Sequence, residues 1–512
     1  MATTQARRAI RSAPTERPAV SISPGLRERI GQIAQATEKA ILEALGAENL
    51  PGRPEEFQGL EERLLKVCRG ELVGAVLSEV LEAIHASQEF VLWSMRDARR
   101  REDLGSRGDR AVSVRVGGGR EVAVTTPYMS PLTPRGEPGR PRRRGSRGEG
   151  GGGLYPVLAA LGFVCDVSPY VASLTALTAA LVDSHEEAVD TLGQHGLKMD
   201  VDTVRRIVAR VADAGIVARE QGEPGDPTAL AGKRVVVGID GGRLRYRIPK
   251  AGRPRKSGRH GYSTPWREPK VVTIYTVDEE GKMRPGEKPI YEGTLAPWDD
   301  AISLIASTLE RNGAKDAELL AIAADGSDNI WRDIDRLVVG IGIDPSRVAK
   351  FVDFCHVVEH LSAAAKLVSN LETDQQRQQW TTKLSKRLKK GHVEEVIHTL
   401  EAAPTASKKD REALESEIEY CRKRIDMMRY HYLKQRGLPI GSGAVESAIR
   451  RIVNLRLKNP GTFWRPDNAE RMLYLRCRAK AGRWAEVEAA LYRAARRPAR
   501  SVVPEIFPRL TE

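Results

Sequence analysis

Two short apolar runs in this chain each end at an aspartate. Arg234 is followed by VVVGID, which ends at Asp240, and Glu318 is followed by LLAIAAD, which ends at Asp325. Runs of this length without alternating polar residues are typical of strands buried on both faces of a helix-covered sheet. Because parallel strands end at a common edge, where open α/β sheets bind ligands, the two carboxylates are expected to lie close together. The sequence therefore predicts an α/β core with an acidic site at one sheet edge.

The surrounding segments predict further strands and helices. Apolar and β-branched residues mark strands at 234–239, 244–248, 271–277, 319–323 and 348–354. A helical pattern covers 298–311, between the third and fourth strands, and the pattern from 356 to 433 is wholly helical. Three hairpin-like strands, a helix, a strand, a helix and a strand are the order of an RNase H-like α/β fold.

A third carboxylate, Glu446, begins another predicted helix. It stands four residues after Ser442, a candidate N-cap, and the apolar residues Ile449, Val453 and Leu457 repeat along the helix at intervals of four. Hard oxygen donors such as these three acids suit magnesium or manganese. We expect two ions, with Asp240 bridging both, Asp325 holding one and Glu446 the other. Such a pair activates the attacking oxygen and stabilises the leaving oxygen of a phosphodiester.

The charge of the chain favours a nucleic acid as partner. The 512 residues carry a formal net charge of +14, and 41% of them are hydrophobic, which is enough for real cores. No apolar run approaches the roughly 18 to 20 residues that span a bilayer, so the interpretation is a cytoplasmic protein without a membrane partner. Five cysteines are scattered singly, which indicates neither disulfides nor a structural zinc.

Basic residues with interleaved aromatics follow Asp240 and are candidates for binding double-stranded DNA, with a solvated loop as the alternative. They are Arg243, Arg245, Arg247, Lys250, Arg253, Arg255, Lys256 and Arg259, around Tyr246, Tyr262 and Trp266. Further cations that could reach DNA are Arg205 and Arg206, and Arg450 and Arg451 beside Glu446 could hold a phosphate. Trp331 and Trp464 are interpreted as core anchors, with stacking on a flipped base as the alternative.

The part before the predicted sheet divides by composition into four segments. Residues 1–24 are predicted to be a disordered tail, 25–130 a helical domain with a small β hairpin around 117–119, and 131–153 a basic linker rich in Pro, Gly and Arg. Residues 154–220 predict three helices in a helix-turn-helix-like pattern, for which an ordinary helical packing unit is the alternative.

Four motifs resemble the DDE transposases of bacterial insertion sequences, most closely the Kra-type group. They are GIDGGRLRYR, ADGSDNIW, FVDFCHVVEHL and GLPIGSGAVESAIRRIVNLRLKNPGTFW. The resemblance implies an RNase H-like catalytic core at 232–360 and 436–512, split by an all-α insertion at 361–435. It also implies Asp240, Asp325 and Glu446 as the metal-binding catalytic triad.

The resemblance further implies roles for the residues of an Asp-x-x-His motif. His356 is expected to orient a phosphate or tune the metal site, and Asp353 is the rival to Asp325 for the second acid. The activity implied is cleavage of transposon ends and joining of their 3′ ends to target DNA by a dimer or larger oligomer. The resemblance also implies a bacterial protein associated with the nucleoid. A related nuclease that cuts without joining, and a domesticated DNA-binding protein without activity, remain the alternatives.

Overall fold

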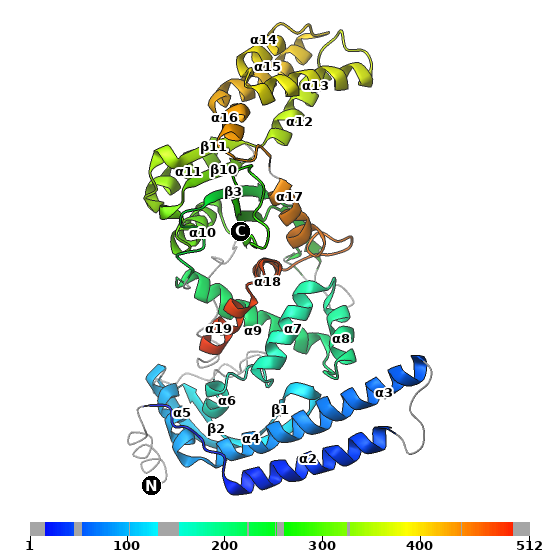
Figure 1. Ribbon diagram of the computed structural model, residues 1–512, viewed down its shortest axis with the longest axis vertical. Coiled ribbons are helices and arrows are strands. Elements are labelled where there is room, and N and C mark those ends of the chain that lie inside the picture. Colours follow the sequence, from blue (N-terminus) through cyan, green and yellow to red (C-terminus); the bar gives the residue numbers. More distant parts are fainter. Residues whose placement is uncertain are drawn as a thin grey trace. The chain divides into compact units, whose positions relative to one another are not determined.

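The computed structural model describes residues 16–45, 54–101, 103–131, 153–222, 225–250, 252, 261–324, 328–441 and 443–494. The chain forms two compact units: Met1–Gln221 together with Arg483–Glu512, and Gly222–Gly482 (Figure 1). Each unit contains both helices and strands, so the protein is an α+β, multidomain chain. The predicted tail up to residue 15 and the predicted linker from 132 to 152 lie outside the described residues.

The first unit contains a helical layer with one β hairpin and a second group of helices. The hairpin consists of β1 (Leu104–Arg115) and β2 (Glu121–Pro131), antiparallel and longer than predicted, with Gly118 at a φ of 83° in the turn. Its apolar face packs on Leu81 and Leu158. The helices before it are α2 (Pro24–Leu45), α3 (Pro54–Lys66), the π-helical η1 (Val67–Val73), α4 (Gly74–Ala86) and α5 (Gln88–Arg101).

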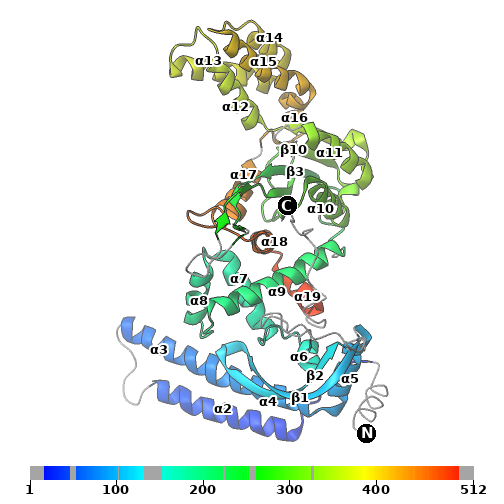
Figure 2. The same ribbon diagram turned by 180° about the vertical axis from the view of Figure 1, so that it is seen from behind.

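The second group of helices matches the pattern read in 154–220. Its members are α6 (Pro156–Ala160), α7 (Pro169–Leu181), α8 (His185–Gln194), α9 (Val201–Glu220) and α19 (Trp484–Ala494). Helix α19 packs on α7 and α9 (Figure 2), and Trp484 donates a hydrogen bond to Ser173. The boundary drawn from sequence groups α19 with 436–512, whereas it belongs to the same compact unit as α7 and α9.

The second unit is built on a five-stranded mixed sheet with the order β11-β10-β3-β8-β9. Strands β3 (Arg234–Gly241), β8 (Lys270–Val277) and β9 (Ile290–Thr294) form an antiparallel meander, and β10 (Leu319–Ala324) and β11 (Val348–Val352) run parallel to β3. Figure 1 shows α10 (Trp298–Arg311) and α11 (Asp328–Ile341) on one side of the sheet and α17 (Gly443–Ile449) on the other. The buried runs of β3 and β10 are confirmed as central strands.

One predicted strand is wrong and one strand was missed. Residues 244–248 do not join the sheet, because they form the short strands β4 (Leu244–Arg245) and β5 (Ile248–Pro249) of a separate ribbon. The third sheet strand is β9, whose Glu292 and Gly293 obscure the strand pattern in the sequence. Glu292 is 1% exposed because two arginines neutralise it, and Gly293 lets helix α18 (Pro466–Ala481) approach the strand closely.

The stretch after β11 is helical, as predicted, and forms a bundle at one end of the unit (Figure 2). Its elements are α12 (Phe354–Ala365), α13 (Asp374–Lys390), α14 (Val393–Glu401), α15 (Lys408–Lys423), η5 (Ile425–Met428) and α16 (Tyr430–Gln435). The π-helical η6 (Arg450–Asn454) continues α17. Across the described ranges, none of the helices combines the length and apolarity that crossing a membrane requires.

Candidate active site at the carboxyl edge of the sheet

The parallel strands β3, β10 and β11 end at one edge, as the sequence predicts. Ala323 of β10 pairs with Gly238 of β3, and Ala324 pairs with Val352 of β11. Asp240 is the second-last residue of β3 and is half-buried, and its Oδ1 accepts a hydrogen bond of 2.6 Å from the amide of Gly241. Asp325 lies outside the described residues, so its side chain is not placed.

A cluster of possible metal ligands lies at the end of β11. One carboxylate oxygen each from Asp353 and Glu446 and the Sγ of Cys355 all lie within 4.8 Å of one another. Asp353 is 5% exposed, whereas Cys355 and Glu446 are exposed. Asp240 is not a member of this cluster. The structure thus brings together Glu446 and Asp353, the expected rival of Asp325.

Local structure explains how Asp353 and Glu446 come to meet. Asp353 caps α12, since its Oδ1 accepts from the amide of His356 at 3.0 Å. The next amide, that of Phe354, donates to the carbonyl of Ile440 at 3.0 Å and so ties the segment before α17 to the start of α12. Glu446 then lies in the first turn of α17, where the helix dipole stabilises a negatively charged carboxylate.

Gly238 allows α17 to lie against the sheet. A Cβ at Gly238 would be 3.1 Å from the Cβ of Val445, the neighbour of Glu446. We expect Gly238→Ala to destabilise the protein by about 1 kcal/mol, because the added methyl overpacks this contact and pushes Glu446 away. In Gly340→Ala, where nothing lies within 4 Å, the same change is expected to stabilise by about 0.5 to 1 kcal/mol. Urea unfolding of both variants checks the opposite signs, and a stabilised Gly238→Ala would contradict the close packing.

The donor set suits a hard divalent ion. Burial first, and then the nearby charges of Asp353 and Glu446, raise the pKa of the Cys355 thiol, so the thiol stays protonated at neutral pH. Two carboxylates are the number with which proteins commonly hold magnesium, and their hard oxygens suit magnesium or manganese.

Removing the thiol tests this assignment. We expect Cys355→Ser to bind manganese within about threefold of the native chain, since the two carboxylates remain. The measurement is manganese binding by calorimetry, with Cys68→Ser as the control for loss of a thiol that is not buried. A loss of manganese binding in Cys355→Ser but not in Cys68→Ser would contradict the oxygen-ligand assignment.

His356 is held by a chain of contacts from the helical bundle. Its Nε2 lies 3.3 Å from the Nε2 of His360, whose Nδ1 lies 2.6 Å from the carboxylate of Glu417 on α15. The ring of His360 also stacks on Tyr420, with centroids 3.7 Å apart. Because a carboxylate only accepts, the Nδ1 of His360 donates to Glu417. The Nδ1 of His356 faces a second carboxylate, that of Glu359, at 3.5 Å.

The basic ribbon after β3 has the predicted mixture of cations and aromatics. Strand β4 pairs with β7 (Trp266–Arg267), and β5 pairs with β6 (Tyr262–Ser263). The guanidinium of Arg245 lies 4.5 Å from the Trp266 ring centroid and that of Arg247 lies 4.4 Å from that of Tyr262. Arg243, Arg245, Arg247 and Lys250 are exposed, while Arg253, Arg255, Lys256 and Arg259 lie outside the described residues.

The remaining candidate residues are distributed as follows. Arg205 is ion-paired with Asp202 at 3.2 Å and with Glu186 at 3.8 Å, while Arg206 is exposed. Arg450 is exposed, and Arg451 donates to the hydroxyl of Tyr291 at 2.5 Å.

The two tryptophans are core residues, as the sequence analysis favoured. Trp331 and Trp464 are each 6% exposed. The backbone of Trp464 also bonds to Arg245 and Arg247 and so anchors the ribbon.

Cys355, Glu417 and Tyr420 were not predicted as site residues. Cys355 stands two positions after Asp353, so the helical turn that follows a capping aspartate is the signal that could have found it. Glu417 and Tyr420 have no such signal, because they are 57 or more residues from the histidines that they contact.

Comparison with known proteins adds no family name, because no family model, no curated protein and no solved structure matches this chain.

Proposed function

We propose that this protein is a metal-dependent DNA transposase of the DDE type. The observation that carries the proposal is the approach of the Asp353 and Glu446 carboxylates to within 4.8 Å, at the sheet edge where β3 ends in Asp240. Carboxylates gathered in a chain with a formal net charge of +14 suit a site that holds cations against a polyanion.

The sheet topology supports an RNase H-like core. A three-stranded antiparallel meander, β3-β8-β9, continues through two strands parallel to its first strand, and the first strand lies at the centre of the sheet. This is the element order on which the sequence-based proposal rests, with β9 in place of residues 244–248. The helical stretch from α13 to α16 lies between the last strand and Glu446, where the insertion is proposed.

The proposed roles follow from position. Asp240, Asp325 and Glu446 bind the two ions, and Asp353 joins Glu446 either as a further ligand or in place of Asp325. His356 orients the scissile phosphate, and the exposed Arg243, Arg245 and Arg247 track the strand beyond it. When bound, magnesium or manganese supplies activation of the attacking oxygen and charge stabilisation at the leaving oxygen. A dimer or larger assembly would hold two DNA ends.

The test uses labelled duplexes that carry the DNA flanking the coding region, incubated with the full chain and magnesium or manganese. We expect cleaved and joined products, both lost in Asp240→Asn. Cleavage without joining would instead support the nuclease, and tight binding without cleavage would support a DNA-binding protein. Comparing Asp325→Asn with Asp353→Asn decides which acid is the second ligand.

A further inference from the structure

Helix α13 of the helical bundle carries a polar stripe that the proposed active site does not use. We call the α13 stripe the five exposed residues Gln375, Gln379, Lys383, Lys386 and Lys390, which recur at intervals of three or four along one helix face. Their side chains border a shallow surface hollow of about 660 Å³. No acidic residue stands within the stripe.

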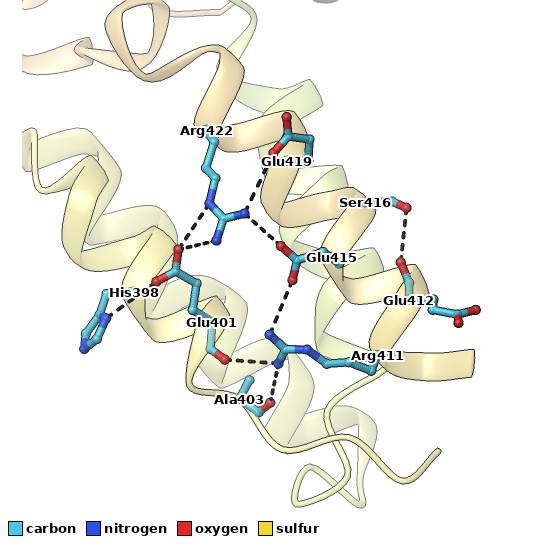
Figure 3. A network of polar contacts seen from close by, with 9 residues as sticks. All are labelled: His398, Glu401, Ala403, Arg411, Glu412, Glu415, Ser416, Glu419 and Arg422. Carbon is cyan, nitrogen blue, oxygen red and sulfur yellow. Dashed lines mark hydrogen bonds and ion pairs between the residues drawn. The ribbon is translucent and has the colours of Figure 1, made fainter. Parts of the chain in front are cut away.

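The lysines of the stripe differ from the arginines of α15. In the part of the bundle that the structure describes, Lys383, Lys386 and Lys390 make no ion pair. On α15, by contrast, Arg422 lies 2.7 Å from Glu401 of α14 and 2.8 Å from Glu415 (Figure 3). These arginines are therefore compensated by glutamates, whereas the lysines of the α13 stripe present uncompensated positive charge.

The stripe begins beside the candidate active site. The ammonium group of Lys389, next to Lys390, lies 4.5 Å from the ring centroid of Phe354, the residue between Asp353 and Cys355. From this end the stripe runs back along α13 to Gln375. The fifteen steps from Gln375 to Lys390, at a rise of about 1.5 Å each, span about 22 Å, the length of about six or seven base pairs of duplex.

We propose that the α13 stripe binds the phosphate backbone of a DNA duplex that leads away from the active site. Ammonium groups with amide donors in line are the side chains that contact phosphates without reading bases. Favourable interaction with the helix dipole accounts for cations in the last turn, such as Lys390, but not for Lys383, which lies two turns earlier. The placement of the duplex next to the cut rests on the proposed function, whereas the binding itself does not.

The test compares two triple variants of the full chain with the same change in charge. Lys383→Gln/Lys386→Gln/Lys390→Gln removes the lysines of the stripe. Lys408→Gln/Lys409→Gln/Lys423→Gln removes lysines of α15, two of which lie within 4.0 Å of a glutamate. Lysine and glutamine have similar helix propensities, so both variants are expected to fold. Fluorescence anisotropy of a labelled random-sequence duplex is measured between about 50 and 200 mM salt.

The logarithm of the binding constant falls as the logarithm of the salt concentration rises. We expect this slope to become shallower by about 2 to 3 in the stripe variant, and to change by less than about 1 in the α15 variant. Equal slopes in the two variants and the native chain would overturn the proposal, as would an equal loss in both, which would report net charge alone. Weaker capture of polyglutamate with unchanged DNA binding would also overturn it, in favour of an acidic protein partner.

The outcome is separable from that of the proposed function. Because anisotropy needs no cleavage, a reduced slope in a chain that never cuts DNA supports the stripe while the transposase proposal fails. If the native chain cuts and joins DNA while the stripe variant shows an unchanged salt dependence of binding, the transposase proposal holds and the DNA-binding role of the stripe is wrong.

Discussion

Replacing Glu446 with glutamine is expected to reduce metal-dependent DNA cleavage on the order of a thousandfold, or about 4 kcal/mol in the barrier. Glutamine keeps the shape of the side chain in the first turn of α17. It loses the negative charge of the Glu446 carboxylate, an oxygen of which lies within 4.8 Å of a carboxylate oxygen of Asp353. The loss falls on metal binding, because a neutral amide is a weak ligand for magnesium. The measurement is the single-turnover cleavage rate together with manganese binding by calorimetry.

The control for Glu446→Gln is Glu310→Gln, an exposed glutamate on α10 far along the chain from the cluster. It removes the same charge and is expected to leave both readouts unchanged. DNA affinity in Glu446→Gln is expected to stay equal or to rise, since a negative charge beside the phosphates is gone. Unchanged manganese binding would remove Glu446 from the metal site, and unchanged cleavage with one fewer bound manganese would show that this ion is not needed for the reaction.

Replacing Glu292 with glutamine is expected to destabilise the second unit by about 3 to 5 kcal/mol. Glu292 is 1% exposed on β9 and accepts hydrogen bonds from Arg478 at 2.6 Å and from Arg311 at 3.0 Å. Glutamine leaves both guanidinium groups in place and removes the charge that compensates them, and Arg478 has no exposed surface. Urea unfolding of the full chain, with limited proteolysis to assign the transition to 222–482, measures the loss.

The matched comparison is Arg478→Met, in which Glu292 keeps its ion pair with Arg311. We expect it to cost clearly less than Glu292→Gln, because no charge that contacts Arg311 is lost. If Arg478→Met proves the more damaging of the two, the packing of the Arg478 stem matters more than the charge, and the electrostatic account is wrong.

Several elements could be read from the sequence because their signals are local. The apolar runs of β3 and β10 and the helical period of α10 were predicted with bounds close to those observed. A buried strand or an amphipathic helix is encoded within its own ten or so residues. Strand β9 was missed because its buried glutamate is explained only by Arg311 and Arg478, which come 19 and 186 residues later.

The candidate site could be predicted only in part. The positions of Asp240 at a strand end and of Glu446 at a helix start follow from residue patterns, and both are observed. That Asp353 lies beside Glu446 does not follow, because it depends on a hydrogen bond between Phe354 and Ile440 across the whole helical bundle. The support of His356 by Glu417 depends in the same way on how α12 packs on α15.

The sequence by itself determined which segments are buried strands and helices, where acids end them, and that the chain is basic enough to favour a polyanion. Only the tertiary structure decided which acid meets Glu446 and which lysines of the bundle remain uncompensated. The physical reason is that burial and periodicity are properties of neighbouring residues, whereas the meeting of two side chains depends on the packing of distant elements. Gly238 illustrates this, since its missing Cβ matters only because Val445 lies against it.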